Sequence, residues 1–197
     1  KYNLPFITDL RRDALAGADP HKAGYYDVLF AYFNCLKTVG AIREGSHGAE
    51  ILEALREGVR ELSSLSSLAQ QSILLLLQRM AEEYFPTTAE WELILSLTAT
   101  VAERSAYRRV RDRAYVGLRY LRFFRARMAK EPPERLVALE EETVRAALRR
   151  RSCHDFAYRA FTIRYIVLSE QDLLALLPER FVRSKKKREH LLFLLEF

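Results

Sequence analysis

Signals for the start of a helix recur along the chain at intervals of similar length. They lie at Ser46, Thr87, Pro132 and Ser169, which are 41, 45 and 37 residues apart. Each one opens a segment whose apolar residues follow helical spacing. Units of this length predict helical hairpins that stack along the chain and bury their apolar faces against their neighbours.

The composition agrees with a helical fold. Leu, Ala, Arg and Glu dominate, only seven glycines and six prolines occur in 197 residues, and no convincing pair of strands is visible. We therefore predict an all-α protein of about 8–10 helices without a sheet, arranged as an α-solenoid-like helical-hairpin array. Residues 1–45 would form an N-terminal helical region and residues 46–197 one continuous repeat domain. The alternative is a non-repetitive helical bundle.

Residues 50–82 read EILEALREGVRELSSLSSLAQQSILLLLQRMAE, in which a Leu-rich helix leads into an LS-x-x-x-L turn and a second Leu-rich helix. This stretch resembles the repeats of octotricopeptide and heptatricopeptide proteins and those of FAST-kinase-like proteins. Residues 168–177, LSEQDLLALL, repeat part of the pattern, whereas Leu75 to Gln78 replace the central Trp-Ala of better repeats. The resemblance implies a role in organellar RNA binding or processing, or a helical subunit of an organellar ribosome.

Residues 106–130 concentrate the positive charge of the chain. They contain eight arginines and a lysine but a single acid, Asp112, and so carry +8 of a net charge that is only +6 overall. The rest of the chain therefore sums to −2. A local basic stretch of this kind favours a polyanion-binding face over a generally basic protein.

A helix through this stretch separates its residues into faces. The expected core stripe consists of Val110, Ala114, Leu118, Leu121 and Met128. A third arc, with Arg109, Arg113, Tyr120 and Arg127, is expected on the solvent side. Between them, five residues spaced 3, 4, 4 and 3 apart form what we call the basic ridge: Arg108, Arg111, Tyr115, Arg119 and Arg122.

The basic ridge has the residue types that bind RNA. Arginine offers a bidentate donor to phosphate, and a tyrosine among arginines can stack on bases. A second basic cluster, at Lys185, Lys186 and Lys187, is a further candidate for phosphate contact. Two alternatives remain open: the arginines could pair with the acids at 140–142, which we expect on a solvated helix face, or they could bind an acidic protein partner.

No pattern in the sequence predicts an enzyme. Neither a phosphate-binding Gly-rich loop nor paired metal-ligating histidines occur, so we expect no cofactor, no metal and no small-molecule substrate. The consecutive Cys153, His154 and Asp155 diverge by about 100° per residue on a helix and cannot form a relay. The Glu44–His47 spacing straddles an expected helix cap, which argues against a metal site.

The compartment and partners are inferred from the remaining features. Two isolated cysteines favour a reducing intracellular compartment, and no apolar run approaches the ~20 residues of a membrane-spanning helix. We therefore expect a non-catalytic RNA-binding helical-repeat protein without membrane contact. It would belong to an organellar, mitochondrial ribonucleoprotein or ribosome and would also contact other protein subunits. The alternative is a protein–protein scaffold, favoured by the apolar C-terminal residues LLFLLEF.

Overall fold

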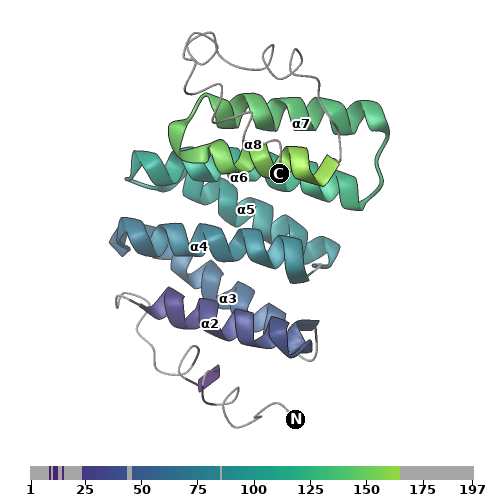
Figure 1. Ribbon diagram of the computed structural model, residues 1–197. Coiled ribbons are helices and arrows are strands. Elements are labelled where there is room, and N and C mark those ends of the chain that lie inside the picture. The colour runs from purple at the N-terminus through teal and green to yellow at the C-terminus, as the bar shows by residue number, and fades with distance from the viewer. Residues whose placement is uncertain are drawn as a thin grey trace. The chain divides into compact units, whose positions relative to one another are not determined.

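The computed structural model describes residues 9, 11–12, 15, 24–43, 46–84 and 86–164, and all regular structure in this part of the chain is helical (Figure 1). The prediction of an all-α fold is therefore confirmed there, while the helices expected after Ser169 lie outside the described residues. The α-helices are α2 (Tyr25–Thr38), α3 (His47–Arg60), α4 (Ser67–Arg79), α5 (Thr88–Arg104), α6 (Arg108–Met128), α7 (Pro133–Leu148) and α8 (His154–Arg164).

Short segments of other helix types connect or extend these helices. The 3₁₀-helices are η1 (Ala41–Arg43), η2 (Leu62–Ser64) and η4 (Arg151–Cys153), and a π-helix, η3 (Met80–Tyr84), continues α4. The chain divides into two compact units, residues 1–114 and 115–197, and the division falls inside α6. The boundary expected at residue 45 lies within the first unit.

The helix boundaries follow local signals in the sequence. Helix α5 begins with a capping box in which the Thr87 hydroxyl accepts from the backbone of Glu90 while the Glu90 carboxylate accepts from the backbone of Thr87. Gly40 adopts a φ of 77° just after α2, a backbone conformation that glycine tolerates best. Ser46 caps α3, as the sequence predicts, although its hydroxyl bonds to Glu50 and not to the backbone.

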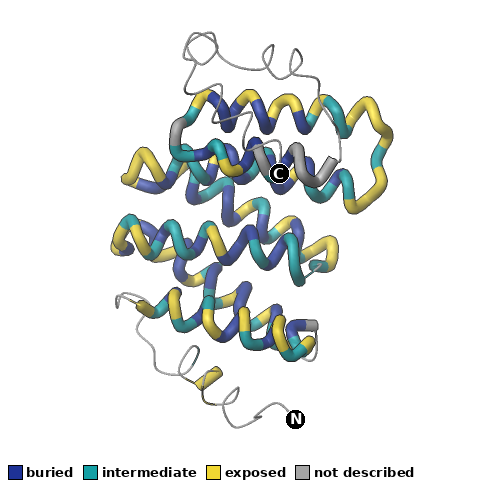
Figure 2. Tube along the Cα trace, in the orientation of Figure 1, coloured by how far each residue is buried: buried dark blue, intermediate teal, exposed yellow. Residues whose placement is uncertain are grey.

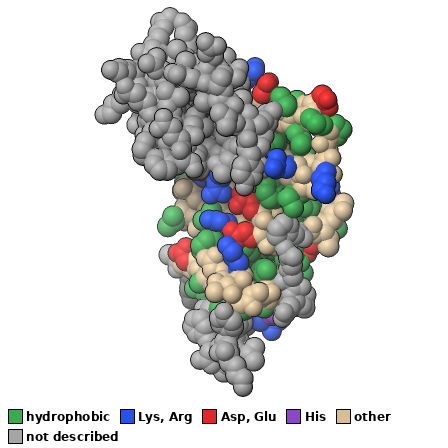
Figure 3. Space-filling model, turned by 45° about the vertical axis from the view of Figure 1, so that its right-hand side comes forward, with side chains coloured by type: hydrophobic (Ala, Val, Ile, Leu, Met, Phe, Trp, Pro, Cys, Tyr) green, Lys and Arg blue, Asp and Glu red, His purple; other side chains and the backbone are tan. Residues whose placement is uncertain are grey.

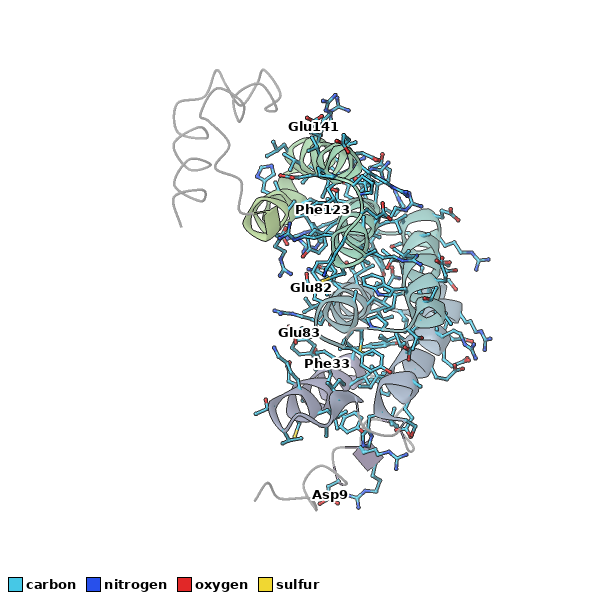
Figure 4. All side chains as sticks on the ribbon, turned by 90° about the vertical axis from the view of Figure 1, so that its right-hand side faces the viewer. Asp9, Phe33, Glu82, Glu83, Phe123 and Glu141 are labelled. Atoms are coloured by element: carbon cyan, nitrogen blue, oxygen red, sulfur yellow. The ribbon has the colours of Figure 1, made fainter. Side chains whose placement is uncertain are left out.

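Within the first unit, helices contact both the next helix in the sequence and the one after it. Helix α2 contacts α4, α3 contacts α5, and α4 contacts both α3 and α5. Figure 2 shows buried positions recurring along each of these helices, with exposed positions between them. Phe33 of α2, which is fully buried, points toward the neighbouring helices in Figure 4.

Glycine allows two tyrosines to pack against the backbone of α3. A Cβ atom at Gly58 would lie 2.1 Å from the hydroxyl oxygen of Tyr26, and one at Gly48 would lie 2.3 Å from the ring of Tyr84. The Tyr26 hydroxyl is buried and has no hydrogen-bond partner among the described residues, and burial raises its pKa. The close approach of α2 to α3 therefore depends on the absence of a side chain at Gly58.

We expect Gly58→Ala to lower the free energy of unfolding by about 1–3 kcal/mol through overpacking, despite the better helix propensity of alanine. Adding Tyr26→Phe removes the hydroxyl that the new methyl group meets and should restore part of this loss. Chemical denaturation of the two single variants and the double variant measures the coupling. Additive effects would show that Gly58 and Tyr26 are not in contact.

A buried glutamine joins two connections of the first unit. The Gln70 side chain is 1% exposed, and its amide nitrogen donates to the carbonyl oxygens of Leu62 at 2.7 Å and Leu65 at 3.1 Å. Its amide oxygen accepts from the hydroxyl of Ser105 at 2.6 Å. One side chain on α4 thus holds both the turn before α4 and the loop between α5 and α6.

Replacing Gln70 with leucine would remove its hydrogen bonds to the Leu62 and Leu65 carbonyls and the acceptor of the Ser105 hydroxyl, while the Leu62 carbonyl would keep its bond from the Leu65 N–H. We expect the free energy of unfolding to fall by about 2–4 kcal/mol, because each unsatisfied buried group costs roughly 1–3 kcal/mol. Gln71→Leu is the matched control, since the Gln71 amide bonds only within α4, to Ser67. Equal unfolding midpoints for the two variants would contradict the role of Gln70.

The described part of the second unit contains the C-terminal part of α6 together with α7 and α8, and α7 packs along α8. The buried ring of Tyr120 lies 5.6 Å from the ring of Phe156 on α8, between ring centres. Gly117 also faces Phe156, with 3.4 Å between an added Cβ atom and that ring. Aromatic packing therefore holds α8 against α6.

Candidate nucleic-acid interface

Helix α6 carries the basic ridge and runs without interruption for 21 residues. At its start the backbone N–H of Tyr107 donates to the Ser105 hydroxyl at 3.2 Å. At its end Lys130 adopts a φ of 55°, and the N–H of Glu131 donates to the carbonyl of Ala126 at 3.0 Å. The predicted helix and its end before Pro132 are confirmed.

Helix α6 is buried along two stripes, although the sequence predicted one. Val110, Ala114 and Leu121 of the expected core stripe are buried, Leu118 is half-buried, and Met128 is 48% exposed. The second stripe consists of Val116, Tyr120, Phe123 and Ala126, all at most 4% exposed.

The second stripe corrects two expectations. Tyr120 was expected on the solvent side, but it is 2% exposed because it packs on Phe156. Met128 was expected in the core, but it lies in the last turn of α6 and is exposed. The solvent-facing part of α6 is consequently narrower than the sequence predicts, and several arginines lie beside buried positions.

Arg111 of the basic ridge is used inside the first unit. Its side chain is half-buried, and its Nη1 donates to the carbonyl oxygen of Ser105 at 2.6 Å. Ser105 is the same residue whose hydroxyl bonds to Gln70. Arg111 therefore extends the hydrogen-bond network that holds the loop before α6, and its guanidinium group is less open to a ligand than the sequence alone suggests.

Arg119 has protein partners on several sides. Its Nε lies 2.8 Å from the Glu142 carboxylate of α7, and its Nη1 donates to the Tyr115 carbonyl at 3.2 Å. Only 19% of its side chain is exposed. Pairing between the ridge and the acids at 140–142, one of the alternatives drawn from the sequence, thus occurs at this position.

The ring of Tyr115 lies between two guanidinium groups. The Cζ atom of Arg119 is 3.6 Å from the ring centre and that of Arg150 is 4.2 Å from it. Two planar groups this close to one ring centre would overlap over a single face, so they occupy opposite faces. Such cation–π contacts are stabilising, and they leave no open ring face for a base in this arrangement. The sequence suggested no contact between Arg150 and Tyr115, which are 35 positions apart.

Other arginines of α6 point into solvent. The Arg108 side chain is 90% exposed, with its Nε 4.0 Å from Asp112, the only acid of the helix. Arg109 and Arg122 are also exposed. Lys185, Lys186 and Lys187 lie outside the described residues. The structure therefore separates the ridge into residues held by the protein, at 111, 115 and 119, and exposed arginines, at 108 and 122.

The acids of α7 differ from one another. Glu141 and Glu142 are exposed, whereas Glu140 is 2% exposed, which corrects the expectation that all three lie on a solvated face.

Elsewhere, basic and acidic side chains lie next to one another on the face drawn in Figure 3. On α3, for example, Arg56 pairs with Glu53 and Arg60 with Glu57. Helix α6 does not have this balance of basic and acidic residues, because it contains eight arginines and one acid.

Glu44 lies outside the described residues, and the described residues considered for catalysis or metal binding are Cys153, His154, Asp155 and His47. Cys153 is buried while Asp155 is exposed, so the Cys-His-Asp triplet is not gathered at one surface. No group of three or more His, Cys, Asp or Glu side chains in the described part of the chain could hold a metal ion. His47 instead bonds through Nδ1 to the Tyr32 hydroxyl at 2.8 Å.

Glu50 of α3 is the centre of a polar cluster near that histidine. Its carboxylate accepts from Arg11 at 2.6 and 3.0 Å and from the Ser46 hydroxyl at 2.6 Å. These hydrogen bonds, from Arg11 first, lower the pKa of Glu50 from 4.5 to about 2. Burial and the nearby Glu50 charge raise the pKa of Tyr32 to about 12. The cluster joins Arg11 to the start of α3.

The lowered pKa of Glu50 predicts a pH-dependent contribution to stability. The contribution is complete above pH 4.5 and is lost as the pH falls toward about 2, because protonation breaks the charged contacts. We expect the ion pair of the Glu50 carboxylate to contribute about 1 kcal/mol to the free energy of unfolding, because both side chains of the pair are partly exposed. Denaturation of wild type and Glu50→Gln across this range should give stabilities that converge at low pH. A constant difference between them would contradict this assignment.

No protein-family model, curated protein or solved structure matches this chain. Among the described residues, none of the helices combines the length and the apolar character needed to cross a bilayer. The main chemical feature of this site is the set of arginines on α6.

Proposed function

We propose that this protein binds RNA without catalysis, through phosphate contacts made by the exposed arginines of α6. The observation that carries the proposal is the charge of this helix, which has eight arginines and one acid in 21 residues. Arg108 and Arg122 project into solvent on the basic ridge, and Arg109 lies exposed beside it. Contacts of this kind give affinity with little sequence readout.

The packing of the helices supports an array of hairpins as the scaffold for this surface. In the first unit, α2 contacts α4 and α3 contacts α5, so alternate helices lie against each other as in stacked hairpins. We propose an α-solenoid-like arrangement on this basis. The resemblance of residues 50–82 to octotricopeptide-type repeats extends the proposal to a mitochondrial ribonucleoprotein or ribosome, in which other protein subunits would be neighbours.

The variant Arg108→Gln/Arg122→Gln tests the proposal without disturbing the internal contacts of Arg111 and Arg119. We expect weaker binding to single-stranded and structured RNA. For the single strand, the slope of log affinity against log salt should become shallower by about 1.4, or about 0.7 for each lost phosphate contact. Fluorescence anisotropy across a salt series measures both quantities.

Arg56→Gln/Arg60→Gln is the matched control, because it removes the same charge from α3, where both arginines pair with glutamates of their own helix. It should change the slope little. If the wild type does not bind RNA near physiological salt, or if the α6 variant retains the wild-type slope, the proposal is wrong.

A protein scaffold remains the second candidate, and exposed leucines on α4 favour it. Leu68 is 69% exposed and Leu75 is 38% exposed, and they lie seven residues apart on the same side of the helix. Exposed apolar residues grouped in this way are typical of protein-binding surfaces when they form a patch. Loss of partner binding in Leu68→Ser/Leu75→Ser, with no RNA binding by the wild type, would support the scaffold.

A further inference from the structure

Glu142 of α7 forms an ion pair with the guanidinium group of Arg119 on α6. Its carboxylate lies 2.8 Å from Nε of Arg119, and 52% of the Glu142 side chain is exposed. Carboxylate and phosphate oxygens bind the same N–H donors of arginine. An RNA phosphate can therefore bind the Nε–H donor only by replacing Glu142.

The remaining contacts of Arg119 do not depend on Glu142. Its Nη1 donates to the Tyr115 carbonyl one turn earlier in α6, and its guanidinium plane lies over the Tyr115 ring. Arg150 holds the opposite face of that ring and also donates to the carbonyl of Ala146 at 3.2 Å. The guanidinium of Arg119 would consequently keep its position after the carboxylate leaves, ready for another anion.

We propose that Glu142 is an internal competitor for phosphate, which a phosphodiester group of single-stranded RNA displaces from Arg119. This inference rests on the proposed function. The Arg119 side chain is 19% exposed, so its donors are recessed among Tyr115, Glu142 and Arg150. A flexible single strand can bring a phosphate into such a site, whereas the regular backbone of a duplex is held at the protein surface. Glu142 thus lowers the affinity for single-stranded RNA.

The experiment compares Glu142→Gln with Glu141→Gln, which remove the same charge from adjacent positions of α7. Glu141 points outward in Figure 4 and is exposed. The probes are a labelled oligouridylate and an RNA duplex of equal length, titrated by anisotropy over a salt series. Glu142→Gln should bind the single strand several-fold more tightly, with a salt slope close to that of the wild type, because the phosphate contacts Arg119 in both complexes. Binding of the duplex should change little.

Glu142→Asp gives a test at constant net charge. The shorter side chain draws the carboxylate away from Arg119, so we expect tighter binding of the oligouridylate than in wild type, by a smaller factor than for Glu142→Gln. Thermal unfolding followed by circular dichroism checks that each variant remains folded. If Glu142→Gln does not fold, the affinity of Glu142→Asp for the oligouridylate, compared with that of the wild type, tests the inference alone.

Equal changes in Glu142→Gln and Glu141→Gln, with wild-type affinity in Glu142→Asp, would overturn the inference, because general charge would then explain the effect. No change in any of the three variants would also overturn it. In both cases the proposed function stands if Arg108→Gln/Arg122→Gln binds RNA more weakly than the wild type does. If the wild type binds neither probe, both proposals fail together.

Discussion

The burial of α6 along two stripes is the constraint that determines what its arginines can do. Val110, Ala114 and Leu121 are buried along one stripe and Tyr120 and Phe123 along the other, so little of the helix circumference is left for eight arginines. An arginine beside a buried stripe loses water and needs acceptors from the protein. The acceptors present are the Ser105 carbonyl for Arg111 and the Glu142 carboxylate for Arg119.

This division gives the basic ridge two kinds of arginine. Arg111 belongs to a hydrogen-bond network with Ser105 and Gln70 that fixes the loop before α6. Arg119 is fixed against Tyr115 and can exchange one anion for another. The exposed arginines can bind phosphate directly: these are Arg108, whose side chain is 90% exposed, and Arg122. An RNA-binding role for α6 therefore depends first on the exposed pair and then on Arg119.

Much of the fold could be predicted from local sequence signals. The capping box at Thr87, the glycine at position 40 and the proline after α6 act over a few residues, and the structure has helix ends at these places. The starts of α3, α5 and α7 follow the predicted spacing for the same reason. Such signals depend on the backbone near each residue and need no knowledge of the neighbouring helices.

The wrong predictions of burial and the contact that was not predicted have a common physical cause. A helical wheel identifies one apolar stripe, and Tyr120 falls outside it although packing on Phe156 buries it. Glu140 looks like its neighbours in sequence but is 2% exposed, and Arg150, which follows α7, lies against the ring of Tyr115 on α6. Contacts between side chains distant in sequence depend on how helices pack, and the sequence pattern of a single helix does not contain that information.

The central claim, that exposed and protein-held arginines of α6 have different roles, can be tested by assigning the Nε–Hε signals of the arginines by NMR during titration with single-stranded RNA. We predict that the signals of Arg108 and Arg122 shift from the first additions, that the signal of Arg119 changes as RNA replaces Glu142, and that the signal of Arg111 stays in place. Unchanged signals of Arg108 and Arg122 at saturating RNA, or an equal shift of Arg111, would contradict the account.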